Sequence, residues 1–122
     1  MIPLTDRTKA FALRIIRLYT SLPKTTEAQV IGKQVLRSGT SIGAHYREAS
    51  RSRSPAEYIS KTELATQELE ETGYWIELII DAEIVPADRL QPLLDETKEL
   101  IAIFVTLAKK AKIEKGRGKR EV

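Results

Sequence analysis

The residue types most able to do chemistry in this chain gather in two neighbouring segments. One, from Ser38 to Ser54, is rich in small and polar residues and carries the only histidine, His45. The next, over residues 55–82, carries several glutamates and the only tryptophan, Trp75. Histidine and carboxylate groups can act as acids, bases or metal ligands, so these two segments are the first candidates for a functional site.

Polar residues in both segments recur at helical spacing. Four of them in the first segment are three, four and three residues apart, which places them on one face of a helix. Because buried polar groups need hydrogen-bond partners, we expect a network that fixes the register of two helices, with Arg47 or His45 as partners of the glutamates. The predicted network consists of Ser38, Ser41, His45, Glu48, Glu68 and Glu71.

The same residues offer an alternative, a metal-dependent bundle enzyme that uses His45, Glu48, Glu68 and Glu71 as ligands. The usual di-metal carboxylate bundle has a Glu-x-x-His pair on each of two helices, whereas this chain has one histidine, in the reversed order. The chain also has no cysteine, which removes thiolate nucleophiles, Cys-ligated zinc and disulfides. We therefore favour the hydrogen-bond network over a metal centre and expect no metal and no cofactor, while the metal-dependent enzyme stays open as the alternative.

Apolar residues at three- and four-residue spacings predict four helices that position these groups. We expect helices over about 5–20, 26–50 and 55–82, and a fourth whose inward stripe runs over 90–111. Short connections favour antiparallel neighbours. The predicted fold is therefore all-α, an antiparallel up-down-up-down four-helix bundle.

Local signals indicate where the helices begin and where they pack closely. Ser54 stands where it can cap the third helix, and Thr26 with Gln29 has the spacing of a capping box for the second. Gly39 and Gly43 share one face of the second helix and cost about 1 kcal/mol each relative to alanine. We expect a neighbouring helix close to these glycines, either the third helix of the same hairpin or a helix of another subunit.

The net charge of +3 hides a segregation of charge along the chain. Residues 1–60 hold ten bases and four acids (+6), residues 61–108 three and eleven (−8), and residues 109–122 seven and two (+5). Either the basic and acidic helices neutralise one another, within or between subunits, or a basic surface is directed at phosphate.

We expect a bundle domain over 1–111 and a basic, disordered tail over 112–122, because the tail has no apolar period.

Several observations bear on location and on nucleic acid. No apolar run is long enough to span a bilayer and no signal peptide is evident, so we expect a cytoplasmic protein that does not enter a membrane. Aromatic residues make up 6% of the chain and none interleaves with the basic tail, so any nucleic acid would be recognised by backbone and shape. The candidate contacts are Arg37, Arg47, Arg51, Arg53, Lys112, Arg117, Lys119 and Arg120.

Two motifs, over residues 38–49 and 68–78, together resemble the bacterial four-helix-bundle family of 23S rRNA intervening sequence proteins. The likeness extends to about Lys112, with His45 where the family usually has asparagine. The resemblance implies a helical bundle that assembles into a ring, typically a homopentamer, an association with genes inserted in ribosomal RNA, and no enzymatic activity. The chain is also similar to the accessory protein of diversity-generating retroelements, a pentameric barrel whose partners are a reverse transcriptase and nucleic acid.

Together these observations predict a non-enzymatic, oligomeric interaction module that binds RNA or a nucleic-acid-associated protein through basic surface and takes no small-molecule substrate. In a ring, the basic first two helices of one subunit would meet the acidic last two helices of the next. A third possibility, beside the metal-dependent enzyme, is a purely protein-binding scaffold whose basic tail only improves solubility.

Overall fold

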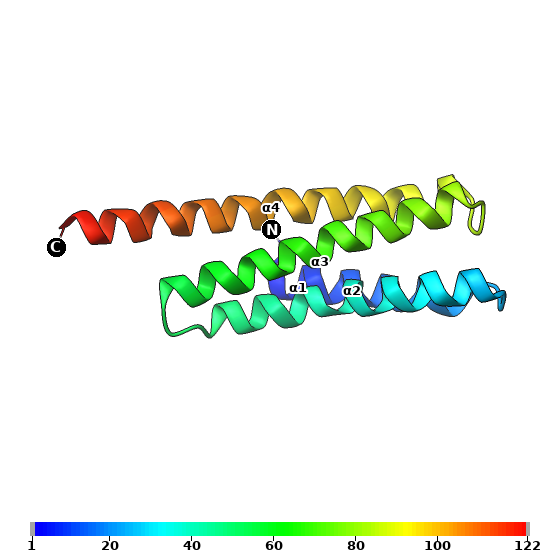
Figure 1. Cartoon of the computed structure of the whole chain (residues 1–122), viewed down its shortest axis with the longest axis horizontal. Helices are drawn as coiled ribbons and strands as arrows, with labels where there is room; N and C mark the ends of the chain where they lie inside the picture. Colours follow the sequence, from blue (N-terminus) through cyan, green and yellow to red (C-terminus); the bar gives the residue numbers. More distant parts are fainter. Residues whose placement is uncertain (1, 122) are drawn as a thin grey trace.

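The computed structural model of the protein describes residues 2–121, and the side chains of residues 2–118. These residues form four helices, α1 (Leu4–Ser21), α2 (Thr26–Ser50), α3 (Pro55–Asp81) and α4 (Ala87–Glu121). Successive helices run in opposite directions (Figure 1). The predicted all-α up-down bundle is confirmed.

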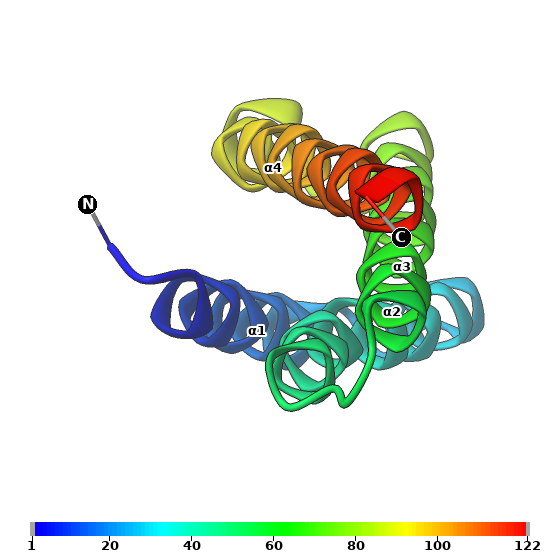
Figure 2. The ribbon, with the colours of Figure 1, turned by 90° about the vertical axis from the view of Figure 1, so that its left-hand side faces the viewer.

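The helices follow one another around an arc when the molecule is viewed end-on (Figure 2). Each helix packs along the next one in the sequence, whereas α1 and α4, at the two ends of the arc, touch at few places. Helix α1 covers only part of the length of the bundle, and the C-terminal half of α4 extends well past it (Figure 1). None of the described helices combines the length and the apolar character that a membrane span requires.

The start of α3 agrees with the sequence prediction. The hydroxyl of Ser54 accepts a hydrogen bond from the backbone N–H of Glu57 (3.1 Å), and Pro55 occupies the first turn. The Glu57 carboxylate in turn accepts from the backbone N–H of Arg53 (3.3 Å). These bonds satisfy backbone donors that a helix N-terminus otherwise leaves unpaired, so α3 begins at a defined residue.

The capping box predicted for the second helix does not form. Helix α1 begins at Leu4 without a side-chain cap, and the residue that precedes α2 is Thr25 rather than Thr26. The side-chain amide of Gln29 donates to the carbonyl of Pro23 (2.9 Å) and accepts a hydrogen bond from the hydroxyl of Tyr19 (3.2 Å). Gln29 therefore ties the α1–α2 turn together instead of closing a capping box.

The core follows the predicted apolar stripes and also contains buried threonines. The hydroxyl of each donates to the backbone carbonyl four residues earlier, at 2.7 to 2.9 Å, so no buried donor is left unpaired in this set. These residues are Thr8, Thr62, Thr72 and Thr97. The largest fully buried side chains are Phe11, Phe104, Ile15, Ile42, Leu69, Ile76, Ile79 and Leu100.

The glycines of α2 face α1, which corrects the expectation that they serve the hairpin with α3. A Cβ atom built on Gly39 would lie 2.7 Å from Ile15 Cγ1, and one on Gly43 would lie 3.1 Å from the hydroxyl of Thr8. A third glycine, Gly32, is similarly close to the side chain of Leu22. Close approach of α1 to α2 therefore explains three glycines inside a helix, where each would otherwise be unfavourable.

Helix α4 continues through the segment that was expected to be disordered. It runs to Glu121 without a break at Lys112. Lysine, arginine, alanine and glutamate are good helix formers, and Gly116 and Gly118 each weaken the helix by only about 1 kcal/mol. The predicted domain boundary at Ala111 stays a prediction.

An ion-pair cluster joins the two ends of the arc. The guanidinium of Arg7 on α1 donates to both carboxylate oxygens of Glu96 on α4 (2.9 and 2.8 Å) and also lies 3.0 Å from Glu99. The hydrogen bond from Arg7 is the main cause that lowers the pKa of Glu96 below its usual range, against the opposing effect of burial. Arg7 and Glu96 are only 24% and 18% exposed, so this pair is better shielded from solvent than an ordinary surface pair.

Replacing Gly39 with alanine is expected to destabilise the bundle, because the new methyl group would press against Ile15. We expect the free energy of unfolding to fall by about 1–3 kcal/mol, measured by urea denaturation followed by circular dichroism. Gly73 is the matched control, since a Cβ there would be 3.6 Å from Thr97 Cγ2, an ordinary contact. Gly73→Ala should keep or raise stability, by up to about 1 kcal/mol. Equal losses in the two variants would contradict the close α1–α2 approach.

Replacing Glu96 with glutamine is expected to lower stability at neutral pH by about 1 kcal/mol, because the charge-assisted pair with Arg7 is lost. The pKa of Glu96 is lower in the folded protein than in the unfolded chain, so its ionised form stabilises the fold above the unfolded pKa. That contribution disappears as the pH falls through the folded pKa. The stability difference between wild type and Glu96→Gln, measured by urea denaturation, should therefore shrink in acid. A difference independent of pH would contradict this assignment.

Candidate nucleic-acid interface

The turn between α2 and α3 carries three exposed arginines. Arg47 lies in the last turn of α2, Arg51 follows the end of that helix, and Arg53 lies in the turn. The backbone N–H of Arg51 donates to the carbonyl of Glu48 (3.2 Å), and Ser54 caps α3, so both ends of the turn are fixed. Among the residues with described side chains, these three arginines form no ion pair. Their guanidinium groups are free to bind an external anion.

The last turns of α4 add positive charge at the same end of the molecule, where α4 extends past the α2–α3 turn (Figure 1). Lys109, Lys110 and Arg117 are exposed and form no ion pair within the described part of the chain. Lys112 is engaged, because its Nζ lies 2.9 Å from a carboxylate oxygen of Glu63 on α3. Two further predicted bases belong to α4 but have no described side chains, Lys119 and Arg120.

Arg37 is engaged within the subunit. Its guanidinium lies 2.7 Å from Glu71 and 3.2 Å from Glu68, and the hydrogen bond to Glu71 is the main cause that raises its pKa. These glutamates were expected to pair with Arg47 or His45, and that expectation is wrong. The antiparallel register places Arg37 opposite them, whereas Arg47 is ten residues, or about 15 Å, further along α2.

The predicted network of polar residues does not form one unit. Ser38 is buried, and its hydroxyl forms a hydrogen bond with the hydroxyl of Thr72 of α3 (2.8 Å), a partner that the sequence pattern did not identify. Ser41 donates to the carbonyl of Ser38 within α2 (2.8 Å). Glu48 pairs with Lys61 (2.7 Å), the main cause that lowers the pKa of its carboxyl. The polar residues therefore make several separate contacts along the α2–α3 hairpin.

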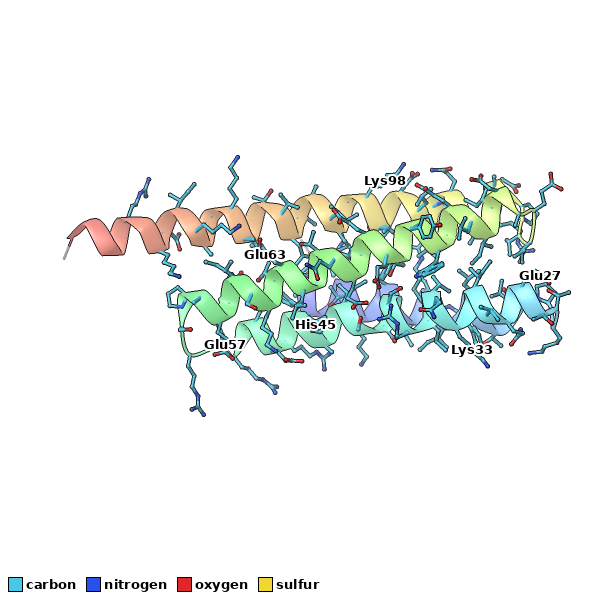
Figure 3. The ribbon with its side chains drawn as sticks, viewed as in Figure 1. Glu27, Lys33, His45, Glu57, Glu63 and Lys98 are labelled. Carbon is cyan, nitrogen blue, oxygen red and sulfur yellow. The ribbon has the colours of Figure 1, made fainter. Side chains whose placement is uncertain are left out.

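The four residues of the metal alternative do not converge. His45 lies on α2 between Lys33 and the α2–α3 turn (Figure 3), and its Nδ1 is buried without a hydrogen-bond partner among the described residues. Glu68 and Glu71 meet Arg37, which is eight residues, or about 12 Å, along α2 from His45. The described part of the chain contains no group of three or more histidine, aspartate or glutamate residues arranged to hold a metal ion.

A groove of about 830 Å³ lies between the start of α3 and the end of α4. It lies at the end of the bundle that α1 does not reach, past the start of α1 at Leu4 (Figure 1). The inward stripe of α4 continues through this region at helical spacing, from Leu107 to Gly118. The groove is lined by Pro55 and Tyr58 of α3 and by Leu107, Lys110, Ala111, Glu114, Lys115 and Gly118 of α4.

Tyr58 is the aromatic residue of this groove, and it is half-buried. Burial is the main cause that raises the pKa of its phenol, and Tyr46 and Glu114 raise it further against a hydrogen bond with Thr62. The phenol therefore stays protonated at neutral pH. The sequence indicated no aromatic residue among the bases of the C-terminal segment, but the fold places Tyr58 beside Lys110 and Lys115.

The signal that could have revealed this groove is the difference in length between the first and last helices. The sequence predicts about 16 residues for the first helix, and the apolar stripe of the last helix alone spans residues 90–111. The pairing of Arg7 with Glu96 places the start of α1 beside the middle of α4. The C-terminal half of α4 therefore extends toward the α2–α3 turn without α1 beside it (Figure 1).

Comparisons with known proteins give a consistent result. A sequence model described as 23S rRNA-intervening sequence protein matches residues 3–106. One similar solved structure is a protein of unknown function from the S23 ribosomal protein family of Bacteroides thetaiotaomicron, 36% identical, with a TM-score of 0.83. The match covers 88% of this chain and 99% of that one. No curated protein matches the chain.

Proposed function

Because the chain belongs to the 23S rRNA-intervening sequence protein family, we propose that it is a non-enzymatic, oligomeric interaction module that binds RNA, or a nucleoprotein, through its basic end. The observation that carries this proposal is the set of three exposed, unpaired arginines at the α2–α3 turn, among the described residues. A cytoplasmic location, expected from the sequence, is part of the same proposal.

Electrostatic attraction supports RNA as the ligand. The arginines of the turn and the bases of α4 lie at one end of the molecule, so a phosphate backbone can contact both groups at once (Figure 1). Guanidinium groups bind phosphate oxygens in a bidentate manner, and each neutralised phosphate releases counterions. Binding should therefore weaken steeply as the salt concentration rises.

The predicted contacts differ in the roles we assign to them. Arg47, Arg51, Arg53 and Arg117 have no competing carboxylate among the described residues and are the primary contacts. Lys112 and Arg37 must share their charge with glutamates of α3, so their contribution to phosphate binding is smaller. The proposal keeps two further candidates on the last turns of α4, Lys119 and Arg120.

Removing the three arginines of the turn is expected to weaken RNA binding. For Arg47→Ala/Arg51→Ala/Arg53→Ala, we expect about a tenfold or greater loss of affinity at physiological salt. We also expect a salt dependence shallower by about 2, since each single-strand phosphate contact contributes roughly 0.7 to the slope. The measurement is fluorescence anisotropy with short labelled RNAs at several salt concentrations.

A matched control removes three exposed positive charges outside the first two helices and away from the basic end, with Lys24→Ala/Arg89→Ala/Lys98→Ala. Lys98 lies on α4, away from Glu57 and the α2–α3 turn (Figure 3). The control should lose much less affinity than the variant of the turn. If both triple variants weaken RNA binding equally, net charge rather than the basic end is responsible. If wild type binds no RNA at physiological salt, RNA is not the ligand.

The oligomeric part of the proposal has support in the charges that remain unpaired within one subunit. Glu70, Glu77 and Asp81 form an exposed acidic stripe along α3, together with Tyr74, which is 54% exposed. Within the described residues, these acids take part in no ion pair. Exposed bases and the half-exposed apolar side chains of Leu13 and Ile16 lie on α1. The first two helices of one subunit can therefore meet the acidic stripe of the next, as a ring requires.

Light scattering is expected to give a mass that is a multiple of the subunit mass of 13.8 kDa, with five subunits as the expected number. Reversing charge in the stripe with Glu70→Lys/Glu77→Lys should lower the measured mass, because it places like charges at the interface. Glu27→Lys/Asp88→Lys, which changes the net charge by the same amount elsewhere, is the control. A wild-type protein that is monomeric at micromolar concentration and moderate salt would contradict the ring.

A further inference from the structure

We propose that the groove between the start of α3 and the end of α4 takes an unpaired nucleotide of single-stranded RNA, with its base stacked on Tyr58. This inference rests on the proposed function and adds the form of RNA that the basic end prefers. It follows from the position of an aromatic ring and two lysines in one groove. A protein that recognises only the phosphate backbone of RNA does not need an aromatic ring there.

The walls of the groove match the two parts of a nucleotide. Tyr58, Pro55 and Leu107 offer an apolar surface for the faces of a base. Lys110 and Lys115 stand on the same lining and can bind the phosphates on either side of that base. An aromatic platform beside a positively charged path is the arrangement that single-strand binding proteins use, and it tolerates any base because every base has a π-face.

The lining also contains groups that can form hydrogen bonds with the edge of a base. The Tyr58 phenol keeps its proton at neutral pH and is therefore a donor. Glu114 is the acidic residue on the lining, and an ionised carboxylate accepts from the exocyclic amino groups of bases. A base inside a duplex cannot reach these groups, because its faces are stacked and its Watson–Crick edge is paired.

The size and charge of the groove favour a nucleotide over a protein helix. A volume of about 830 Å³ falls within the range of small-ligand pockets, roughly 300–1,000 Å³. A stable protein interface needs about 800 Å² from each partner, much more than one groove of this size supplies. A second copy that paired through this same end would bring its own basic α4 end toward Lys110 and Lys115, which like charges disfavour.

The groove also joins the arginine surface through the chain itself. Pro55 on the lining follows Arg53 by two residues, and both belong to the rigid junction that Ser54 and Glu57 fix. A strand whose base enters the groove would therefore extend its backbone toward the arginines of the turn. The groove and the basic turn can thus bind successive nucleotides of one strand.

The test compares single-stranded and duplex RNA of the same length by fluorescence anisotropy with the full chain at physiological salt. Tyr58→Leu keeps an apolar side chain in the groove but removes the aromatic face, and Tyr58→Phe keeps that face. We expect Tyr58→Leu to weaken single-strand binding about fivefold or more and to leave duplex binding unchanged. Tyr58→Phe should retain most of the single-strand affinity.

Tyr19→Leu is the matched control, since Tyr19 is a half-buried tyrosine that packs between α1 and α2 near their turn, outside the groove and outside the acidic stripe. It should bind single-stranded RNA like wild type. Thermal unfolding of each variant establishes that it is folded at the temperature of the binding measurement. Where Tyr58→Leu lowers the unfolding midpoint too far, the comparison of single-strand and duplex RNA in wild type and Tyr58→Phe still decides the question.

Different outcomes overturn the two proposals. If wild type binds both RNA forms equally and Tyr58→Leu binds like wild type, the groove inference is wrong while the basic end remains an RNA site. If wild type binds neither form, the proposed function fails and the groove inference fails with it. An acidic amphipathic peptide that binds wild type but not Tyr58→Leu, in the absence of RNA binding, would assign the groove to a protein partner instead.

Discussion

The close approach of α1 to α2 is the contact on which the shape of this molecule depends. Three glycines on one face of α2 remove the side chains that would hold α1 away, and Ile15 fills the space over Gly39. Phe11 and Ile15 can then reach the core that α2, α3 and α4 share. These glycines and Arg7 hold α1 in place, so its start lies beside the middle of α4. The end of the bundle at the α2–α3 turn therefore consists of α2, α3 and α4 only.

Charge has two roles in this structure, depending on where along the bundle it lies. In the middle, Arg37 and Arg7 are held by glutamates of α3 and α4, so opposite charges are neutralised across helix contacts. At the end formed by the α2–α3 turn, Arg51 and Arg53 have no such partner among the described residues. The net charge of the chain therefore understates how strongly one end is basic.

The sequence was sufficient to predict the helices. It was insufficient to predict which residues face one another across the contacts between helices. The apolar period and the Ser54 cap predicted α3 correctly, because both depend on residues close together in the chain. The helical face of Gly39 was also evident, but its partner was not, since periodicity identifies a face and not the helix that covers it. Arg37 was misplaced for the same reason, because its pairing with Glu71 depends on the register between two helices.

The candidate site also has one part that could be predicted from the sequence and one part that could not. The arginines of the turn could be identified from the sequence, because a short polar connection between two helices is exposed in almost any bundle. The groove beside them could not, because it requires the relative positions of α1, α3 and α4. Tyr58 had the signature of an ordinary core position, and only the absence of a covering helix makes it accessible to a ligand.

The C-terminal part of α4, which has no α1 beside it, has a further consequence for how a ligand would be bound. Beyond Ala111 the helix depends mainly on its own propensity, and Gly116 and Gly118 have no neighbouring side chain within 4 Å of the position a Cβ would take. Stability within a protein is lowest where few tertiary contacts support the backbone. One wall of the groove thus belongs to the part of α4 with the least support. Occupation of the groove and winding of this helix are thermodynamically linked, so each favours the other.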